Sequence, residues 1–218
     1  MFVQFDSAVT GLTVTPYSAY TSGMSITAGP VVGNLYCFFV QFTSYSPYFM
    51  FNWTGSANMG VVIEEYSGVT QMSSTNYVTT SGTSGTASDS LTTDDAAGNT
   101  IVAGMGNITS DSFTATTGNL RQQETSSSDV IVALLDNTNS SPGSLTVAAS
   151  LTSTAWDMIL VELRYVIADV AGTGFATAGN GISQGQIANG DDASTNVALG
   201  NPPIAFVNIP YGQTWPRG

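Results

Sequence analysis

The carboxylates are the side chains best suited to chemistry in this sequence, and their spacing limits what they can do. Glu64 and Glu65 are adjacent at the end of one apolar run, and Glu162 lies inside another. Neighbouring residues of a strand point to opposite faces, so Glu64 and Glu65 cannot form the carboxyl pair that glycoside hydrolysis needs. Either one could still meet Glu162 across a sheet. We favour the alternative that Glu162 is a partly buried carboxylate held by hydroxyl groups or by Arg164.

Nucleophilic catalysis has no support in the composition. The chain contains no histidine, so no Ser-His-Asp or Cys-His arrangement can form. Its one cysteine, Cys37, lies in the run L-Y-C-F-F-V, where we expect a small, buried, apolar residue. We therefore predict that the protein is not an enzyme, with no catalytic residue and no cofactor.

Two oxygen-rich segments could attract calcium. One is Asp94-Asp95 with Asn99 close behind, and the other is Asp191-Asp192. Neither follows the spaced acidic pattern of a calcium loop. Asp and Asn are also ordinary turn residues, so we predict turns and no metal site, with bound calcium left as an alternative.

An aromatic cluster between positions 45 and 53 could stack on sugar rings. Its members are Tyr45, Tyr48, Phe49, Phe51 and Trp53. Strand alternation places Phe49, Phe51 and Trp53 on one face, and one of the two faces must be core. A carbohydrate platform is therefore the second hypothesis for this segment, with Tyr45, Tyr48 and Trp53 as the possible glycan contacts.

Charge is scarce and almost entirely negative. The three cations are Arg121, Arg164 and Arg217, against fifteen carboxylates, and the net charge is −12. This balance argues against nucleic acid and against an anionic membrane surface as partners. Because 42% of the residues are hydrophobic, low charge does not indicate disorder. We expect a surface of Ser, Thr, Asn, Gln and Gly, which suits an exposed particle or an extracellular setting.

The beginning of the chain predicts no secretory signal. Met1 is followed by F-V-Q-F-D, without a basic region or a long apolar region, and no run reaches the length of a transmembrane helix. A virion protein, made in the cytoplasm and released by lysis, would combine this start with an exposed surface. A chain trimmed of its signal would read the same way, so a cell-surface protein is the alternative.

The stretch from Ser144 to Val166 organises the expected fold. Its first part alternates apolar and polar residues, and the part from Trp156 onward is almost continuously apolar, as in a strand covered on both faces. About ten such strands are expected, with no amphipathic helix. The other main runs are Phe2 to Phe5, Leu35 to Phe42, Tyr48 to Trp53, Met59 to Tyr66, Thr86 to Leu91, Thr100 to Gly106, and Val130 to Leu135 with a turn from Asp136.

Composition changes after Tyr165. Residues 168–201 are too rich in glycine for a core and too long for an ordinary loop, and Pro202-Pro203 then leads into the strand-like run I-A-F-V-N-I-P. We predict a body over residues 1–165 and a C-terminal arm over 166–218. The arm would add to the open sheet edge of a neighbour, or fold back on its own sheet. Its expected partner-binding residues are Ile204, Phe206, Val207, Ile209, Tyr211 and Trp215.

The order of these runs resembles a jelly-roll (concanavalin-like) β-sandwich module of bacterial surface and phage-encoded structural proteins. The matching segments are F-V-Q at 2–4, 35–42, E-E-Y-S-G-V at 64–69, 92–106, L-R-Q-Q at 120–123 and 156–163. Leu120 stands where the module has tryptophan, and residues 166–218 have no counterpart in it. The resemblance implies an all-β fold, a two-sheet antiparallel jelly-roll β-sandwich, without catalytic residues.

These observations lead to one functional hypothesis and one alternative. We expect a non-enzymatic structural protein of an assembled particle, most simply a phage head decoration (cement) or fibre protein at the virion surface. It would bind itself or another particle protein through its arm. The alternative is a carbohydrate-binding or adhesive cell-surface module.

Overall fold

A computed structural model describes the body of the protein. The described residues are 1–16, 24–42, 49–67, 69–93, 100–109, 111–125, 130–138, 143–152 and 154–165. The chain divides into two units after Tyr165, and all described residues belong to the first, Met1–Tyr165. The arm residues from Ile204 to Trp215, together with Tyr45 and Tyr48, lie outside the described residues, so those predictions stay predictions.

The described part of the chain consists of β-strands joined by turns and loops, with no helix. The fourteen strands are β1 (Phe2–Phe5), β2 (Thr10–Pro16), β3 (Met24–Val32), β4 (Leu35–Phe42), β5 (Phe49–Thr54), β6 (Met59–Val62), β7 (Val69–Gly82), β8 (Thr86–Thr93), β9 (Thr100–Asn107), β10 (Thr114–Thr117), β11 (Asn119–Thr125), β12 (Ile131–Thr138), β13 (Gly143–Ser150) and β14 (Trp156–Tyr165).

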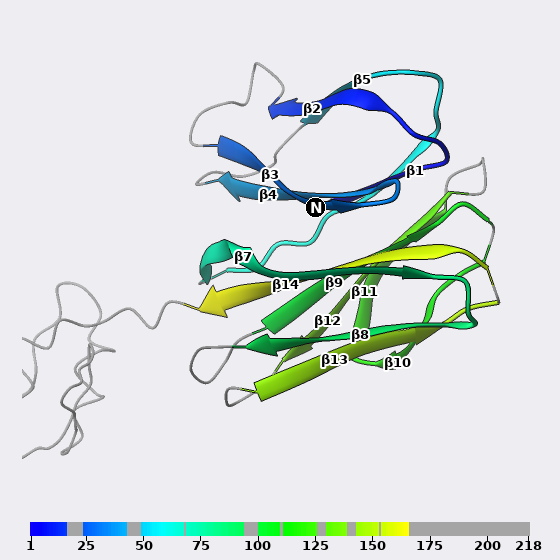
Figure 1. Ribbon diagram of the computed structural model, residues 1–218. Helices are drawn as coiled ribbons and strands as arrows, with labels where there is room; N and C mark the ends of the chain where they lie inside the picture. The colour runs from blue at the N-terminus through cyan, green and yellow to red at the C-terminus, as the bar shows by residue number, and fades with distance from the viewer. Residues whose placement is uncertain are drawn as a thin grey trace, which may run out of the picture. The chain divides into compact units, whose positions relative to one another are not determined.

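These strands form four antiparallel sheets that lie in layers (Figure 1). The first sheet is β2-β5, and the second has the order β3-β4-β1-β6. The third has the order β11-β12-β9-β14-β7, and the fourth is β10-β13-β8. The expected all-β antiparallel sandwich is confirmed, and the described residues add two layers to the pair of sheets that the sequence predicted.

Three hydrophobic cores fill the spaces between successive layers. Strand β14 illustrates this arrangement, because its side chains alternate between two of the three cores. Met158 and Leu160 join the core toward the fourth sheet, while Ile159 and Val161 join the core toward the second sheet. The remaining core, between the first and second sheets, includes Val3, Phe5, Val14 and Phe38. The central strands β12, β9 and β14 of the third sheet are therefore buried on both faces, as the apolar run from Trp156 predicts for β14.

Two strands differ from the sequence prediction. The polar span from Thr70 is not among the runs predicted from the sequence, but β7 runs from Val69 to Gly82 and pairs with β14. The turn-rich segment before Pro30 contains β3. Strand β7 holds many Ser and Thr residues and little apolar periodicity, so it is ordered by pairing with its apolar neighbour β14. Strand β3 contains Gly29 and Pro30, which are turn signals in a sequence, and it pairs with the apolar strand β4.

Two ends were also misplaced. The strand expected over Met59–Tyr66 ends at Val62, and the turn expected from Asp136 is wrong because β12 continues to Thr138. Asp136 lies inside a ladder with β9, opposite Val102. A residue type common in turns can thus lie in a strand when neighbouring side chains satisfy its charge.

Candidate functional site

A buried carboxylate near the end of β12 collects hydrogen bonds from three side chains. Asp136 is 1% exposed, and its Oδ2 accepts from Arg121 Nε at 2.6 Å and from the Tyr66 hydroxyl at 3.1 Å. Its Oδ1 accepts from Asn119 Nδ2 at 3.3 Å. Because a buried charge is stable only when paired and hydrogen-bonded, these three donors account for the carboxylate at this position. We call these four residues the Asp136 cluster.

The backbone places these donors from two directions. Asn119 and Arg121 lie on β11, which pairs with β12, and the register shifts between Leu120 and Gln122. Gly118, just before β11, has φ +92°, and a Cβ there would lie 2.6 Å from the Asp136 carbonyl oxygen. The turn into β11 can therefore approach β12 so closely only at a glycine.

Burial and neighbouring charges keep both Tyr66 and Arg121 in their protonated forms near neutral pH. Burial, together with the neighbouring Asp136 carboxylate, raises the pKa of Tyr66 well above its ordinary value. The hydrogen bond to Asp136 raises the pKa of Arg121 further. Tyr66 thus keeps its proton and Arg121 keeps its charge, so the group is a fixed ion pair with a neutral hydroxyl donor.

The two residues after Arg121 bond to other layers. Gln122 Oε1 accepts from the backbone N–H of Ile63 at 2.9 Å, in the segment that follows β6 of the second sheet. Gln123 Oε1 accepts from the backbone N–H of Phe113 at 2.8 Å, just before β10 of the fourth sheet. Residues 121–123 therefore join the edge of the third sheet to segments of both neighbouring sheets.

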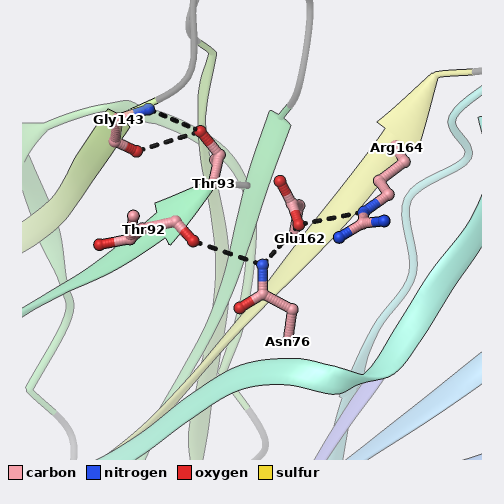
Figure 2. Close-up of polar contacts among 6 residues, drawn as sticks. All are labelled: Asn76, Thr92, Thr93, Gly143, Glu162 and Arg164. Carbon is pink, nitrogen blue, oxygen red and sulfur yellow. Dashed lines mark hydrogen bonds and ion pairs between the residues drawn. The ribbon is translucent and has the colours of Figure 1, made fainter. Parts of the chain in front are cut away.

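A second buried carboxylate, Glu162 on β14, has its own network (Figure 2). Glu162 is 0% exposed, and its Oε2 accepts from Asn76 Nδ2 at 2.5 Å and from Arg164 Nε at 3.3 Å. Asn76 Nδ2 also reaches the Thr92 carbonyl oxygen at 3.4 Å. The predicted pairing with Arg164 is confirmed. Asn76 was missed because β7 was not recognised as a strand.

Thr93 forms the adjoining contact between strands of the fourth sheet. Its Oγ1 donates to the Gly143 carbonyl at 3.0 Å and lies 3.1 Å from the Gly143 N–H, which donates to it (Figure 2). This two-way contact fixes the ends of β8 and β13, and it continues the backbone ladder with a side chain.

The glutamates considered for a hydrolytic pair, Glu64 or Glu65 with Glu162, lie in different environments. Glu64 and Glu65 follow the end of β6 and are exposed, whereas Glu162 is buried. Burial is the main cause of the raised pKa of Tyr66, and Asp136 is the main cause of the raised pKa of Arg121. The charge of Glu64 adds a smaller contribution to both, so Glu64 lies near the Asp136 cluster. The two buried carboxylates, Asp136 and Glu162, are each held by an arginine and by a side-chain amide. These contacts stabilise the packing of the segments that carry them.

A third acidic side chain joins two layers. Asp157 on β14 accepts from the Asn34 N–H at 3.3 Å, in the turn between β3 and β4. Burial raises the pKa of Asp157 above its usual value. A Cβ at Gly33, which has φ +53°, would lie 2.2 Å from the Asp157 carboxylate, so this contact requires a glycine in the turn.

The aromatic face of β5 faces the core. Trp53 is half-buried and packs its ring against Phe5 at a centroid distance of 5.2 Å and an angle of 63°. Phe49 and Phe51 join the same core, while Met50 and Asn52 are exposed on the other face. The Trp53 ring therefore offers only part of its surface to any glycan.

The remaining candidates give no reactive centre. Cys37 is 2% exposed, and burial raises the pKa of its thiol to about 12, as expected for an inert cysteine. An open, largely apolar pocket of about 310 Å³ lies beside Leu12, Val31 and Tyr36. In the ranges that the structure describes, no three His, Cys, Asp or Glu side chains gather as metal ligands. The segments at Asp94 and Asp191 lie outside those ranges.

No family model, curated protein or solved structure matches this chain. Among the described residues no helix is long and apolar enough to cross a membrane. Two of the motifs that carry the jelly-roll resemblance, E-E-Y-S-G-V and L-R-Q-Q, come together in the fold. Tyr66 of E-E-Y-S-G-V and Arg121 of L-R-Q-Q meet on the same oxygen of Asp136. These two motifs therefore supply contacts that stabilise the fold.

Proposed function

We propose that this chain is a non-enzymatic structural protein of an assembled particle. Its body is a β-sandwich of the jelly-roll kind, and its C-terminal arm binds a neighbouring subunit. The setting that fits best is a phage virion, with the protein at the surface as a head decoration or fibre component. Neither nucleic acid nor membrane is a partner, because cations are so few.

Strand β14 carries this proposal. It pairs with β9 along one edge and with β7 along the other, and its apolar side chains enter two cores. The last strand of the body is thus fully partnered at Tyr165. The sequence continues for 53 further residues and includes the apolar run I-A-F-V-N-I between two prolines. A segment that is not needed to complete the sheet of β14 is available to bind a neighbour.

The polar side chains support a structural role. Arg121 and Arg164 are both engaged by buried carboxylates, so the described part of the molecule presents few cations to a substrate. The outward residues of β8 are hydroxyl-bearing, and Ser90 Oγ lies 2.7 Å from Thr146 Oγ1 across the strand pair. A neutral, hydroxyl-covered sheet face is suited to prolonged exposure to solvent.

Light scattering after size exclusion tests the proposal. The full chain should have the mass of an oligomer, and a chain ending at Val166 should be a monomer. Circular dichroism and thermal unfolding of the shorter chain provide the control that its sheets are intact. If both chains had the monomer mass, binding of a neighbouring subunit through the arm would be excluded.

A further inference from the structure

The first sheet is incomplete at β5. In the described residues this sheet has only two strands, and β5 pairs with β2 alone. Two-stranded sheets are marginal unless they gain a strand or pack on another layer. β5 reads F-M-F-N-W-T and contains no charge, proline, glycine or register shift. Natural edge strands normally carry one of these protections against pairing with another chain.

The other edges of the described sheets are each protected. β2 ends in Pro16 and contains the bulge opposite Trp53, and β3 contains Pro30 and a register shift. β6 and β10 have four residues each. β7 has two register shifts, β8 contains Asp89, and β11 contains Arg121 and Glu124. Only β5 is left as an unguarded edge.

The core beneath this edge is also incompletely covered. The inward residues of β5 (Phe49, Phe51 and Trp53) are half-buried. Met59 and Val61 of β6, which belong to the same core, are half-buried too. Other members of this core, such as Phe5 on β1, are fully buried. An additional strand beside β5 would remove further apolar surface from water, which is the usual driving force for strand addition.

The arm contains a segment that fits this edge. Ile204–Ile209 has six residues between Pro203 and Pro210, and β5 also has six. The segment has no charge, and alternation places Ala205, Val207 and Ile209 on one face and Ile204, Phe206 and Asn208 on the other. With the first face toward the core, the second face would mix apolar side chains with an amide, as the outer face of β5 does with Met50 and Asn52.

We propose that Ile204–Ile209 of one copy adds to the outer edge of β5 in a second copy, as the third strand of the first sheet. This inference rests on the proposed function, since it names the place where the arm binds. Each copy has one donor arm and one acceptor edge. Reciprocal exchange would produce a two-fold dimer, and exchange in one direction a larger ring or an open filament.

Mixed single-cysteine variants of the full chain test this pairing. An arm variant, Asn208→Cys, is mixed under mild oxidation with a differently tagged acceptor variant, Met50→Cys, Asn52→Cys or Thr54→Cys. These three acceptor positions lie on the outer face of β5, and together they cover different registers in which the arm strand could pair with β5. Leu120→Cys, 40% exposed on the edge strand β11, is the matched control. The native Cys37 is buried and does not compete.

We expect a disulfide-linked heterodimer with at least one β5 variant, in about tenfold higher yield than with L120C, because a bound arm raises the local thiol concentration. Equal or higher yield with L120C would overturn the assignment to β5. A monomer with an internal disulfide in the double variant N52C/N208C would overturn exchange between copies. If light scattering shows arm-dependent association while no β5 variant is linked, β5 is excluded and the proposed function stands. Without arm-dependent association, both are excluded.

Discussion

Arg121 and Asp136 form an ion pair between neighbouring strands, with 2.6 Å between Nε and Oδ2. The two side chains differ sharply in environment, since Arg121 is 46% exposed and Asp136 is 1% exposed. The partly exposed arginine can be solvated by water without this pair. The buried carboxylate cannot, so its charge depends on the arginine. Removal of the arginine leaves a buried negative charge with two neutral donors, Tyr66 and Asn119.

This asymmetry gives the first prediction. Arg121→Ala should lower the free energy of unfolding by about 3 kcal/mol, because an unpaired buried charge remains. Tyr66→Phe should cost about 1 kcal/mol, the usual value for one lost hydrogen bond. Urea unfolding measures both, and Leu120→Ala on the same strand is the matched control. Equal small losses for all three variants would mean that Asp136 does not depend on Arg121.

Gly104 and Phe2 test the stacking of the second sheet on the third. A Cβ at Gly104 would lie 2.2 Å from Cδ1 of the Phe2 ring, inside the core between those sheets. Gly104→Ala should destabilise by about 1–3 kcal/mol through overpacking. In the double variant with Phe2→Leu the effect of Gly104→Ala should shrink, because the ring is gone. Additive effects in this cycle would show that the two residues do not touch.

Alkaline pH should weaken the fold through Cys37 and Tyr66. Burial raises the pKa of Cys37 from 9.0 to about 12, and burial also raises the pKa of Tyr66 from 10.0. The unfolded chain releases these protons first, so the contribution of these two groups to the free energy of unfolding is constant below pH 9 and falls as pH rises above it. Each unit of difference is worth about 1.4 kcal/mol.

Denaturant unfolding between pH 8 and 11 measures this loss. Cys37→Ala should make the decline shallower just above pH 9, where the thiol of the unfolded chain ionises. Tyr66→Phe should remove a part that begins near pH 10. An unchanged slope in both variants would mean that neither group is buried in its neutral form.

Trp53 separates the structural role from the glycan alternative. Its half-buried ring packs on Phe5, so Trp53→Ala should lower the free energy of unfolding by about 2 kcal/mol, less than for a fully buried tryptophan. A glycan array with wild-type protein is the companion measurement, and we expect no binding. A glycan bound by the wild type and lost in a stably folded Trp53→Ala variant would favour the adhesive module instead.

The sequence predicted those elements whose burial follows a simple period. Strand β13 alternates and β14 is apolar on both faces, and both were located within a residue or two. The layers could not be predicted, because alternation shows that a strand has a buried face without showing which sheet covers it. Strand β7 was missed because it is held as a strand by pairing with β14, and its own sequence does not show that pairing.

The two buried carboxylates show a similar division. Glu162 and Arg164 share a strand face, so their contact follows from spacing alone. Asp136 had only the signal of a turn residue in D-N-T-N. Its three donors come from positions 66, 119 and 121, and only the folded topology brings them together. Long-range polar contacts of this kind leave no periodic trace in a sequence.

The arm can be tested most directly in the full-length chain with a single charge. Val207→Asp places a carboxylate within the apolar run of the arm, and Asn201→Asp places the same charge just before it as a control. Light scattering should give the oligomer mass for wild type and Asn201→Asp, and the monomer mass of 22.6 kDa for Val207→Asp. An identical mass for all three proteins would contradict arm-mediated assembly.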